Sequence, residues 1–313
     1  MDSGTLITGG TGAMGQVLVR SILSRGTAVR VLTLPGDPNA AALGQRGVDV
    51  RFGNVQNPED CRGLCEGIST VLHLAAIIIT DDPSLYTSVN AGGTRNMVAE
   101  AEASGVSHFI HVSSASVVYP KVTPYSVSKR IAEEMVRKSK VPWTIVRPTL
   151  IYGKKGGQEF DMFLDYLGRL PIIPFIGQGN ALKRPVFVDD VVNGLLTLTG
   201  MHKGTGKVYN FSGPEAISII DFARFCLLLQ RQGLKPIVRL PVALCLAIAA
   251  AMRVTMKHPP LKWSVIAGIT QDANLDPAEA MADLGYASRS MEEMLPECFP
   301  RIRSILQHLS ASQ

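Results

Sequence analysis

The stretch TGGTGAMG, residues 8–15, decides the fold of this chain. It follows the β-prone run Thr5–Thr8 and precedes Gln16–Arg25, whose apolar residues recur at helical spacing. Glycines between a strand and a helix allow a tight turn, let backbone N–H groups approach a pyrophosphate, and let the helix pack closely on the strand. A purely structural glycine turn is the alternative. The position of the stretch favours a dinucleotide site with these cofactor-binding residues: Gly9, Thr11, Gly12, Ala13, Met14 and Gly15.

Strand-like and helix-like segments alternate along the first half of the chain. After the first helix, we expect strands at Ala28–Leu34, Val48–Phe52, Val71–Ala76, His108–Ser113 and Trp143–Arg147, and helices at Thr94–Ala103 and Tyr125–Lys138. Apolar strands separated by helices are typical of a parallel sheet covered on both faces. We therefore predict an α/β fold, with a Rossmann-type doubly wound parallel sheet and a smaller, mainly helical C-terminal lobe.

The alternation ends near Pro148, where loops rich in glycine and proline begin. We expect residues 1–150 to form the dinucleotide-binding domain and residues 185–212 to return to it. Residues 151–184 and 213–313 then form a substrate-binding lobe, with the small-molecule substrate held between the two parts.

Composition limits the classes of partner. The 313 residues include 31 Lys+Arg against 26 Asp+Glu, and charged residues make up only 18%. A small positive excess spread along the chain does not indicate nucleic-acid binding, which needs a clustered basic surface. Five cysteines without a CxxC pair indicate neither a metal site nor disulfides. Because the N-terminus does not read as a signal peptide, we expect a cytoplasmic protein with reduced thiols.

Tyr125 and Lys129 share one helical face, since they stand at positions i and i+4. A phenol with a pKa of about 10 is a poor base at neutral pH, but a neighbouring ammonium and an oxidised nicotinamide lower that pKa. The tyrosine can then take a hydroxyl proton as hydride leaves, or return it to a ketone. Ser113 and Ser114 end the preceding strand, where a hydroxyl can hold the substrate oxygen. An ordinary surface Tyr and Lys is the alternative, and the upstream glycine stretch favours catalysis.

The choice between NAD and NADP stays open. An acidic residue at the end of the second strand would bind the ribose 2′-OH of NAD, and an arginine would bind the 2′-phosphate of NADP. Thr33 and Leu34 occupy that place, and Pro35-Gly36-Asp37 follows. Asp37 is within reach of a ribose hydroxyl, but we expect it to be a solvated turn residue.

Seven segments, taken in order, make the chain similar to the short-chain dehydrogenase/reductases, in their extended or atypical epimerase/dehydratase branch. They are Thr8–Gly15, His73–Ala76, Asn90–Asn96, Val112–Ser114, Tyr125–Lys129, Arg147–Gly153 and Pro185–Asp190. The resemblance implies that Tyr125 is the acid/base, that Lys129 binds the nicotinamide ribose, and that Ser114 orients the substrate oxygen. It also implies that Asn90 supports the proton relay and that the chain forms a homodimer. Further cofactor contacts are implied at Thr33, Asn54, Val55, Leu74, Ala75, Ala76, Pro148 and Tyr125 itself.

Two departures from the family pattern concern the substrate. The interval Ala115–Pro124 is much shorter than in sugar-nucleotide epimerases, so a loop that shapes the sugar site is trimmed. The C-terminal third also has few basic residues for a nucleotide diphosphate, and the candidates are Arg184, Arg239 and Arg289.

Eleven consecutive apolar residues run from Val242 to Met252. They are too few to span a bilayer, which takes about 20. We expect a core helix, or a lid over an apolar substrate. Peripheral membrane contact through residues 241–263 is the alternative, because Arg253, Lys257 and Lys262 flank the apolar run.

Together these patterns predict an NAD(P)-dependent oxidoreductase or epimerase. It would transfer hydride at a hydroxyl or ketone carbon of a nucleotide sugar or of an apolar, steroid-like or lipid-like ketone. The alternative is a non-catalytic NAD(P)-binding accessory or redox-sensing protein. Such a protein has no chemical need for the set of Ser114, Tyr125 and Lys129.

Overall fold

The computed structural model describes residues 4–154, 157–200, 204–230, 235–257 and 259–299. Its largest sheet contains β1 (Gly4–Thr8), β2 (Val29–Thr33), β3 (Asp49–Phe52), β4 (Ile68–His73), β5 (His108–Val112), β6 (Trp143–Pro148) and β11 (Lys207–Phe211). These seven strands lie in the order β11-β6-β5-β4-β1-β2-β3 and pair in parallel throughout. The predicted fold class is therefore confirmed.

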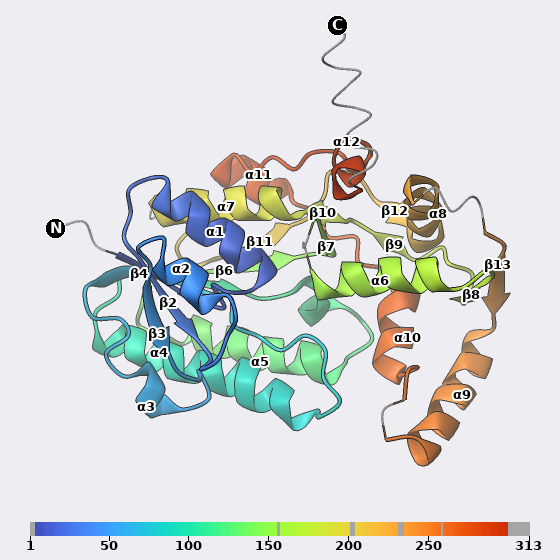
Figure 1. The fold of residues 1–313 in the computed structure, drawn as a ribbon, viewed down its shortest axis with the longest axis horizontal. Coiled ribbons are helices and arrows are strands. Elements are labelled where there is room, and N and C mark those ends of the chain that lie inside the picture. The colour runs from blue at the N-terminus through green and yellow to red at the C-terminus, as the bar shows by residue number, and fades with distance from the viewer. Residues whose placement is uncertain (1–3, 155–156, 201–203, 231–234, 258, 300–313) are drawn as a thin grey trace, which may run out of the picture.

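Helices cover both faces of the sheet (Figure 1). One layer contains α1 (Ala13–Leu23), α7 (Val188–Gly200) and α11 (Ala278–Leu284), and the other contains α3 (Pro58–Cys61), α4 (Gly93–Ala103) and α5 (Pro124–Arg137). The short helix α2 (Ala40–Gly44) lies beside β3 at the sheet edge. Each layer buries a separate apolar cluster against the sheet, which is why the central strands are apolar on both sides.

The order of the strands creates a switch point between β1 and β4. From β1 the chain first builds outward through β2 and β3, then crosses back to β4 and builds in the opposite direction. The loops that leave the carboxyl ends of β1 and β4 therefore diverge and leave room for a ligand, as in other doubly wound sheets.

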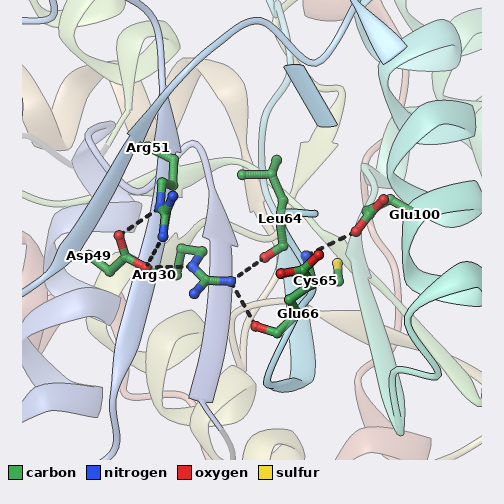
Figure 2. A network of polar contacts seen from close by, with 7 residues as sticks. All are labelled: Arg30, Asp49, Arg51, Leu64, Cys65, Glu66 and Glu100. Carbon is green, nitrogen blue, oxygen red and sulfur yellow. Dashed lines mark hydrogen bonds and ion pairs between the residues drawn. The ribbon is translucent and has the colours of Figure 1, made fainter. Parts of the chain in front are cut away.

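Arg30 on β2 forms hydrogen bonds that hold the edge strand β3 and the turn before β4 in place (Figure 2). Its Nε donates to Asp49 Oδ2 at 2.6 Å on β3, and its Nη1 donates to the carbonyls of Leu64 and Glu66 at 2.8 and 2.9 Å. These carbonyls belong to the turn that leads into β4. One guanidinium thus ties two strands and a turn together.

Much of the rest of the chain packs around a third apolar cluster. It contains α6 (Gln158–Arg169), β8 (Ile173–Ile176), α8 (Ile219–Leu229), β13 (Ile237–Leu240), α12 (Met291–Met294) and the strand pairs β7–β10 (Ile151–Tyr152, Val186–Phe187) and β9–β12 (Leu182–Lys183, Ile217–Ser218). Strand β11 joins the large sheet beside β6, whereas β10 pairs with β7. The division into domains stays a prediction, and residues 1–3, 155–156, 201–203, 231–234, 258 and 300–313 of its ranges lie outside the described residues.

The apolar run predicted near residue 242 forms α9 (Val242–Thr255), which is followed by α10 (Trp263–Thr270). We call these two helices and the residues between them the apolar hairpin. Within α9 only Cys245 and Ala249 are buried, and Val254 is 85% exposed. The core interpretation of this run is therefore wrong, and Figure 1 shows α9 at the periphery with α10 between it and the sheet. No helix in the described ranges is long and apolar enough to cross a membrane.

The role of Arg30 predicts a measurable stability loss. Arg30→Met leaves the carbonyls of Leu64 and Glu66 without their donor, so we expect destabilisation of about 1–3 kcal/mol in a urea melt. The matched control is Arg62→Met, which breaks only an exposed ion pair with Glu59 and should cost less than about 1 kcal/mol. Equal losses in the two variants would contradict this account of the sheet edge.

Candidate active site

The glycine stretch forms the turn between β1 and α1, and two of its glycines are sterically required. Gly9 has φ +75°, and a Cβ there would lie 3.0 Å from the Ala75 nitrogen. A Cβ on Gly15 would lie 2.2 Å from the Gly9 carbonyl oxygen, a distance that no side chain tolerates. Glycine at these positions lets α1 start directly against β1 and lets the loop after β4 approach the turn.

The start of α1 is a suitable anion site. Gly12 is the N-cap and has no side chain to accept from the first helical N–H groups, and the first turn contains no acidic residue. The N–H groups of Ala13, Met14 and Gly15 therefore have no intrahelical acceptor. Backbone donors together with the positive end of the helix dipole suit a pyrophosphate, so these residues fit a dinucleotide.

The other predicted cofactor residues gather at the carboxyl ends of the strands. Thr33 ends β2, Asn54 and Val55 follow β3, Leu74–Ala76 follow β4, and Pro148 ends β6. The loop after β4 is held to β1, since the Leu74 N–H donates to the Thr8 carbonyl at 3.1 Å. Asn54 folds into its own loop, where its side chain bonds the N–H and side chain of Gln56.

Lys129, the charged residue among the predicted catalytic residues, is buried, with 1% of its surface exposed. Its Nζ donates to the Val112 carbonyl at the end of β5, 2.8 Å away. Burial lowers the pKa of Lys129 to about 8, although Glu133 one turn later acts in the opposite direction. The ammonium is thus fixed in position and is close to losing its proton near neutral pH.

Tyr125 lies one turn before Lys129 on α5 and is half-buried. Burial raises the pKa of its phenol, the carboxylate of Glu159 raises it further, and a hydrogen bond with Ser114 acts against both. In the chain alone the phenol is therefore protonated at neutral pH, and the group that lowers its pKa is Ser114 rather than Lys129. Ser114 also caps the 3-10 helix Ala115–Val118, whose Ser116 N–H donates to its Oγ at 3.2 Å.

Asn90 contacts neither Tyr125 nor Lys129 through a side-chain hydrogen bond among the described residues. Its amide instead bonds both backbone groups of Ile77, at 2.8 and 3.0 Å, and donates to Ser128 Oγ at 3.0 Å. It therefore holds the loop after β4 against the catalytic helix.

A buried chain of hydrogen bonds links this amide to the glycine stretch. Thr8 Oγ1 bonds His73 Nδ1 at 2.7 Å, His73 Nε2 bonds Thr94 Oγ1 at 3.0 Å, and Thr94 donates to the Asn90 carbonyl at 2.6 Å. Burial, with a further contribution from the charge of Lys129, lowers the pKa of His73 to about 3, so the ring is neutral. The chain connects the cofactor turn to the catalytic helix.

Tyr86 is a site residue that the sequence analysis missed. Its ring lies 6.0 Å from the ring of Tyr125 in an edge arrangement, and its hydroxyl donates to the Ile78 carbonyl at 3.1 Å. It begins the π-helix Tyr86–Gly92 that carries Asn90. No periodicity marks such a segment, so the only sequence signal was an aromatic hydroxyl four residues before Asn90.

The three candidate arginines for a diphosphate do not converge on Tyr125. Arg289 pairs with the buried Asp190 at 2.7 Å, and Arg184 donates to Asn274 Oδ1 at 2.6 Å. Arg239 is exposed on β13. Two of the three side chains are thus engaged by other parts of the chain.

Exposed apolar side chains lie on segments that adjoin the site. An ion pair between Asp81 and Lys262 joins the loop after β4 to the start of α10. At the other end of α10, the Lys121 N–H donates to the side chain of Gln271 at 2.8 Å and joins that end to the loop before Tyr125. These three segments carry exposed large apolar residues, which we call the apolar rim: Ile78, Ile79, Val118, Val122, Trp263 and Val265.

The amino-acid sequence is similar to a known protein family and to several characterised enzymes. Residues 5–212 match the family model described as "NAD dependent epimerase/dehydratase family". The chain is 26% identical to a 3 beta-hydroxysteroid dehydrogenase/Delta 5-->4-isomerase of Mycobacterium tuberculosis over 349 residues, which cover 97% of this chain and 91% of that protein. It is 33% identical to a ceramide reductase of Caulobacter vibrioides over 172 residues, which cover 55% of this chain and about half, 53%, of that protein.

Among solved structures, the chain is similar to the crystal structure of gox2253. The TM-score is 0.78 at 23% sequence identity, and the match covers 96% of this chain and 98% of that one. At this level of identity the likeness concerns the fold.

The burial of Lys129 predicts an unusual dependence of stability on pH. Its pKa of about 8 in the folded chain lies below the value of about 10.4 in an unfolded chain. The unfolded state therefore binds more protons between these pH values, so this residue destabilises the fold at pH 7 and does so less as the pH rises to 10.

Lys129→Met removes this dependence while filling a similar volume. We expect the melting temperature of the wild type, relative to that of Lys129→Met, to rise between pH 7 and pH 10, measured by scanning calorimetry. Parallel curves for the two proteins would show that Lys129 is not held at a lowered pKa.

Proposed function

Because the chain belongs to the NAD dependent epimerase/dehydratase family, we propose that it exchanges hydride between NAD(P) and a hydroxyl- or ketone-bearing carbon of an apolar small molecule. Family membership makes the protein an NAD(P)-dependent oxidoreductase or epimerase. The observation that carries the finer proposal is the apolar rim on the connected segments next to Tyr125 and Ser114, together with the hydrogen bond of Arg184 to Asn274 and the ion pair of Arg289 with Asp190.

The proposed roles of the side chains follow from their positions. When bound, the nicotinamide accepts hydride from the substrate carbon or returns it. Ser114 donates to or accepts from the substrate oxygen, and Tyr125 takes its proton in oxidation and returns it in reduction. Lys129, held by the Val112 carbonyl, binds the nicotinamide ribose and stabilises the phenolate. Asn90 has a positioning role: its amide holds Ile77 in the loop after β4, which faces the proposed cofactor site.

An apolar substrate agrees with the charges near the site. Glu159 raises the pKa of Tyr125 through its charge, so a carboxylate lies within electrostatic range of the reacting oxygen. A diphosphate would be repelled to the extent that this carboxylate is ionised, and Lys183, which lies within electrostatic range of Glu159, offsets part of that repulsion. The apolar rim offers desolvation to a steroid-like or lipid-like ketone instead. The names of the two relatives, a hydroxysteroid dehydrogenase and a ceramide reductase, point to the same class.

Loss of the phenol tests the proposed chemistry. With a hydrophobic secondary alcohol such as a 3β-hydroxysteroid as substrate, we expect Tyr125→Phe to lower turnover by about 100-fold or more. Its affinity for NADH should stay within a few-fold of the wild type, because the glycine turn and Lys129 supply most of the proposed cofactor contacts.

Two comparisons complete this experiment. Tyr166→Phe on α6 removes a hydroxyl that bonds the Pro174 carbonyl and should leave turnover unchanged. Full activity of Tyr125→Phe would refute the proposed acid/base. Turnover of nucleotide sugars but not of apolar alcohols would refute the substrate class.

We further propose that the apolar hairpin makes a peripheral contact with an anionic lipid surface. Its exposed apolar residues include Leu244, Leu246, Val254 and Met256, and Arg253 and Lys257 are exposed beside them. A helix of 14 residues is about 21 Å long, which suits lying in the interface rather than crossing a bilayer. Because α10 also carries part of the apolar rim, this contact would place the site next to a membrane-dissolved substrate.

Vesicle sedimentation tests the membrane contact. With phosphatidylcholine vesicles that contain phosphatidylglycerol, we expect the wild type to sediment with the lipid and the double variant Leu244→Glu/Val254→Glu to bind about tenfold less. Met281→Glu, which alters an equally exposed residue on α11, is the control and should bind normally.

Two results would count against the contact. One is a wild type that stays in the supernatant with these vesicles, and the other is equal binding by the double variant. The homodimer implied by the resemblance is a separate proposal, which light scattering of the purified chain would test.

A further inference from the structure

The face of α5 that carries Tyr125 and Lys129 continues with two more charged side chains. Glu133 and Arg137 follow Lys129 at intervals of four residues, so each of these side chains is next to the following one on the helix surface. Glu133 is as deeply buried as Lys129, with 1% of its surface exposed. A carboxylate in that position needs partners, because the burial of an unpaired charge is costly.

Two arginines are the partners of this carboxylate. Arg147 Nε donates to Glu133 Oε1 at 2.8 Å, and Arg147 Nη2 donates to Glu133 Oε2 at 2.6 Å. Arg137 Nη2 also donates to Oε2, at 2.8 Å. Burial alone would raise the pKa of Glu133, but hydrogen bonds and neighbouring charges, those of Arg147 foremost, outweigh burial and hold the pKa below its usual value. Glu133 is therefore ionised, and the two-point contact with Arg147 fixes the orientation of its carboxylate.

The ion pair ties α5 to the strand that leads to the proposed nicotinamide pocket. Arg147 lies near the end of β6 and follows Val146, which is paired with Val112 of β5. Val112 is the residue whose carbonyl accepts from Lys129. Consecutive turns of α5 are thus held to adjacent strands, Lys129 to the end of β5 and Glu133 to the end of β6.

Glu133 also acts on Lys129 through its charge. Burial lowers the pKa of Lys129, and the negative charge of Glu133 acts to raise it. His73 on β4 and His111 on β5 lie within electrostatic range of Lys129, and burial followed by the charge of Lys129 lowers the pKa of both rings, so both are neutral. From β6, Arg147 adds a positive charge that is paired with Glu133. Glu133 thus supplies negative charge that favours the ammonium form of Lys129.

We propose that Glu133 is a positioning residue for the reaction: through Arg147 it holds α5 against the end of β6, and its charge keeps Lys129 in the ammonium form beside the cofactor. The inference rests on the proposed function. A purely structural role is the alternative, but a buried ion pair is weak evidence for stability, since apolar residues of similar volume often serve as well. The two roles differ in what they predict for the protonation of Lys129.

Scanning calorimetry follows that protonation without turnover. The melting temperature of each protein is measured at pH 7 and pH 10, relative to the same protein with Lys129→Met. Glu133→Gln keeps the size and removes the charge, so the pKa of Lys129 should fall by about one pH unit. The unfolded state then binds the extra proton over a wider pH interval, so we expect the rise in relative melting temperature to be about 1.5 times that of the wild type.

Turnover is the second readout. In the reduction of a hydrophobic ketone such as a 3-ketosteroid with NADH, activity should be lost at high pH as Lys129 loses its proton. We expect Glu133→Gln to move this alkaline limb of kcat/KM down by about one pH unit and to lower turnover about tenfold. Glu133→Asp keeps the charge but shortens the reach to Arg147, so its turnover should fall while its alkaline limb stays at the wild-type pH.

Two further variants complete the experiment. Glu134→Gln, the same substitution at the next and exposed position of α5, is the control and should match the wild type in both readouts. If Glu133→Gln does not fold, Glu133→Gln/Arg147→Gln removes the arginine charge left without its main partner and is measured in its place, with the same expectation for Lys129.

The outcomes separate this proposal from the one it rests on. A loss of turnover in Glu133→Gln with the wild-type rise in melting temperature and the wild-type pH profile indicates a merely structural role and overturns the proposal, as does unchanged turnover. A wild type that reduces no ketone contradicts the proposed function. In that case the calorimetric comparison still decides whether Glu133 controls the charge of Lys129: a larger rise supports this control, and an equal rise overturns it.

Discussion

The site depends on one steric contact, the approach of Gly15 to the Gly9 carbonyl at the end of β1. Any side chain at Gly15 would push α1 away from the strand, since its Cβ would lie 2.2 Å from that oxygen. With α1 in place, its first N–H groups face the switch point of the sheet, and the loop after β4 closes against Gly9. The position of a dinucleotide, and hence of every group that acts on the substrate, follows from this contact.

Buried hydrogen bonds connect the glycine turn to the catalytic helix α5 and fix their relative position. The hydrogen-bonded chain from Thr8 through His73 and Thr94 reaches Asn90, and the Asn90 amide reaches Ser128 on α5. Each member is buried, so breaking one link would leave an unpaired polar group in the core. Lys129 shows what this arrangement costs, because its burial places a charge where water cannot solvate it. Function rather than stability explains an ammonium in that position.

Local sequence patterns were sufficient for the sheet and its helices. The predicted strand Val48–Phe52 is found at Asp49–Phe52, and the helix predicted at Tyr125–Lys138 is found at Pro124–Arg137. The apolar hairpin was harder, because α9 is apolar on all sides and periodicity cannot tell an exposed helix of this kind from a buried one.

Contacts between distant residues were also beyond the sequence. The ion pair of Asp190 with Arg289 joins residues 99 positions apart, and no motif or periodicity in either segment predicts it. The hydrogen bond from Thr33 to Asp37 depends on a turn whose residues, Pro35 and Gly36, were visible in the sequence but whose direction was not. The predicted catalytic and cofactor residues stay predictions until ligand binding and turnover are measured.

The most direct test of the account is native mass spectrometry of the purified chain after incubation with NAD. We expect one dinucleotide per chain in the wild type and none in Gly15→Ala, whose added methyl group collides with the Gly9 carbonyl. A wild type that binds no nicotinamide dinucleotide, or a Gly15→Ala variant that binds it as well as the wild type, would contradict the central claim.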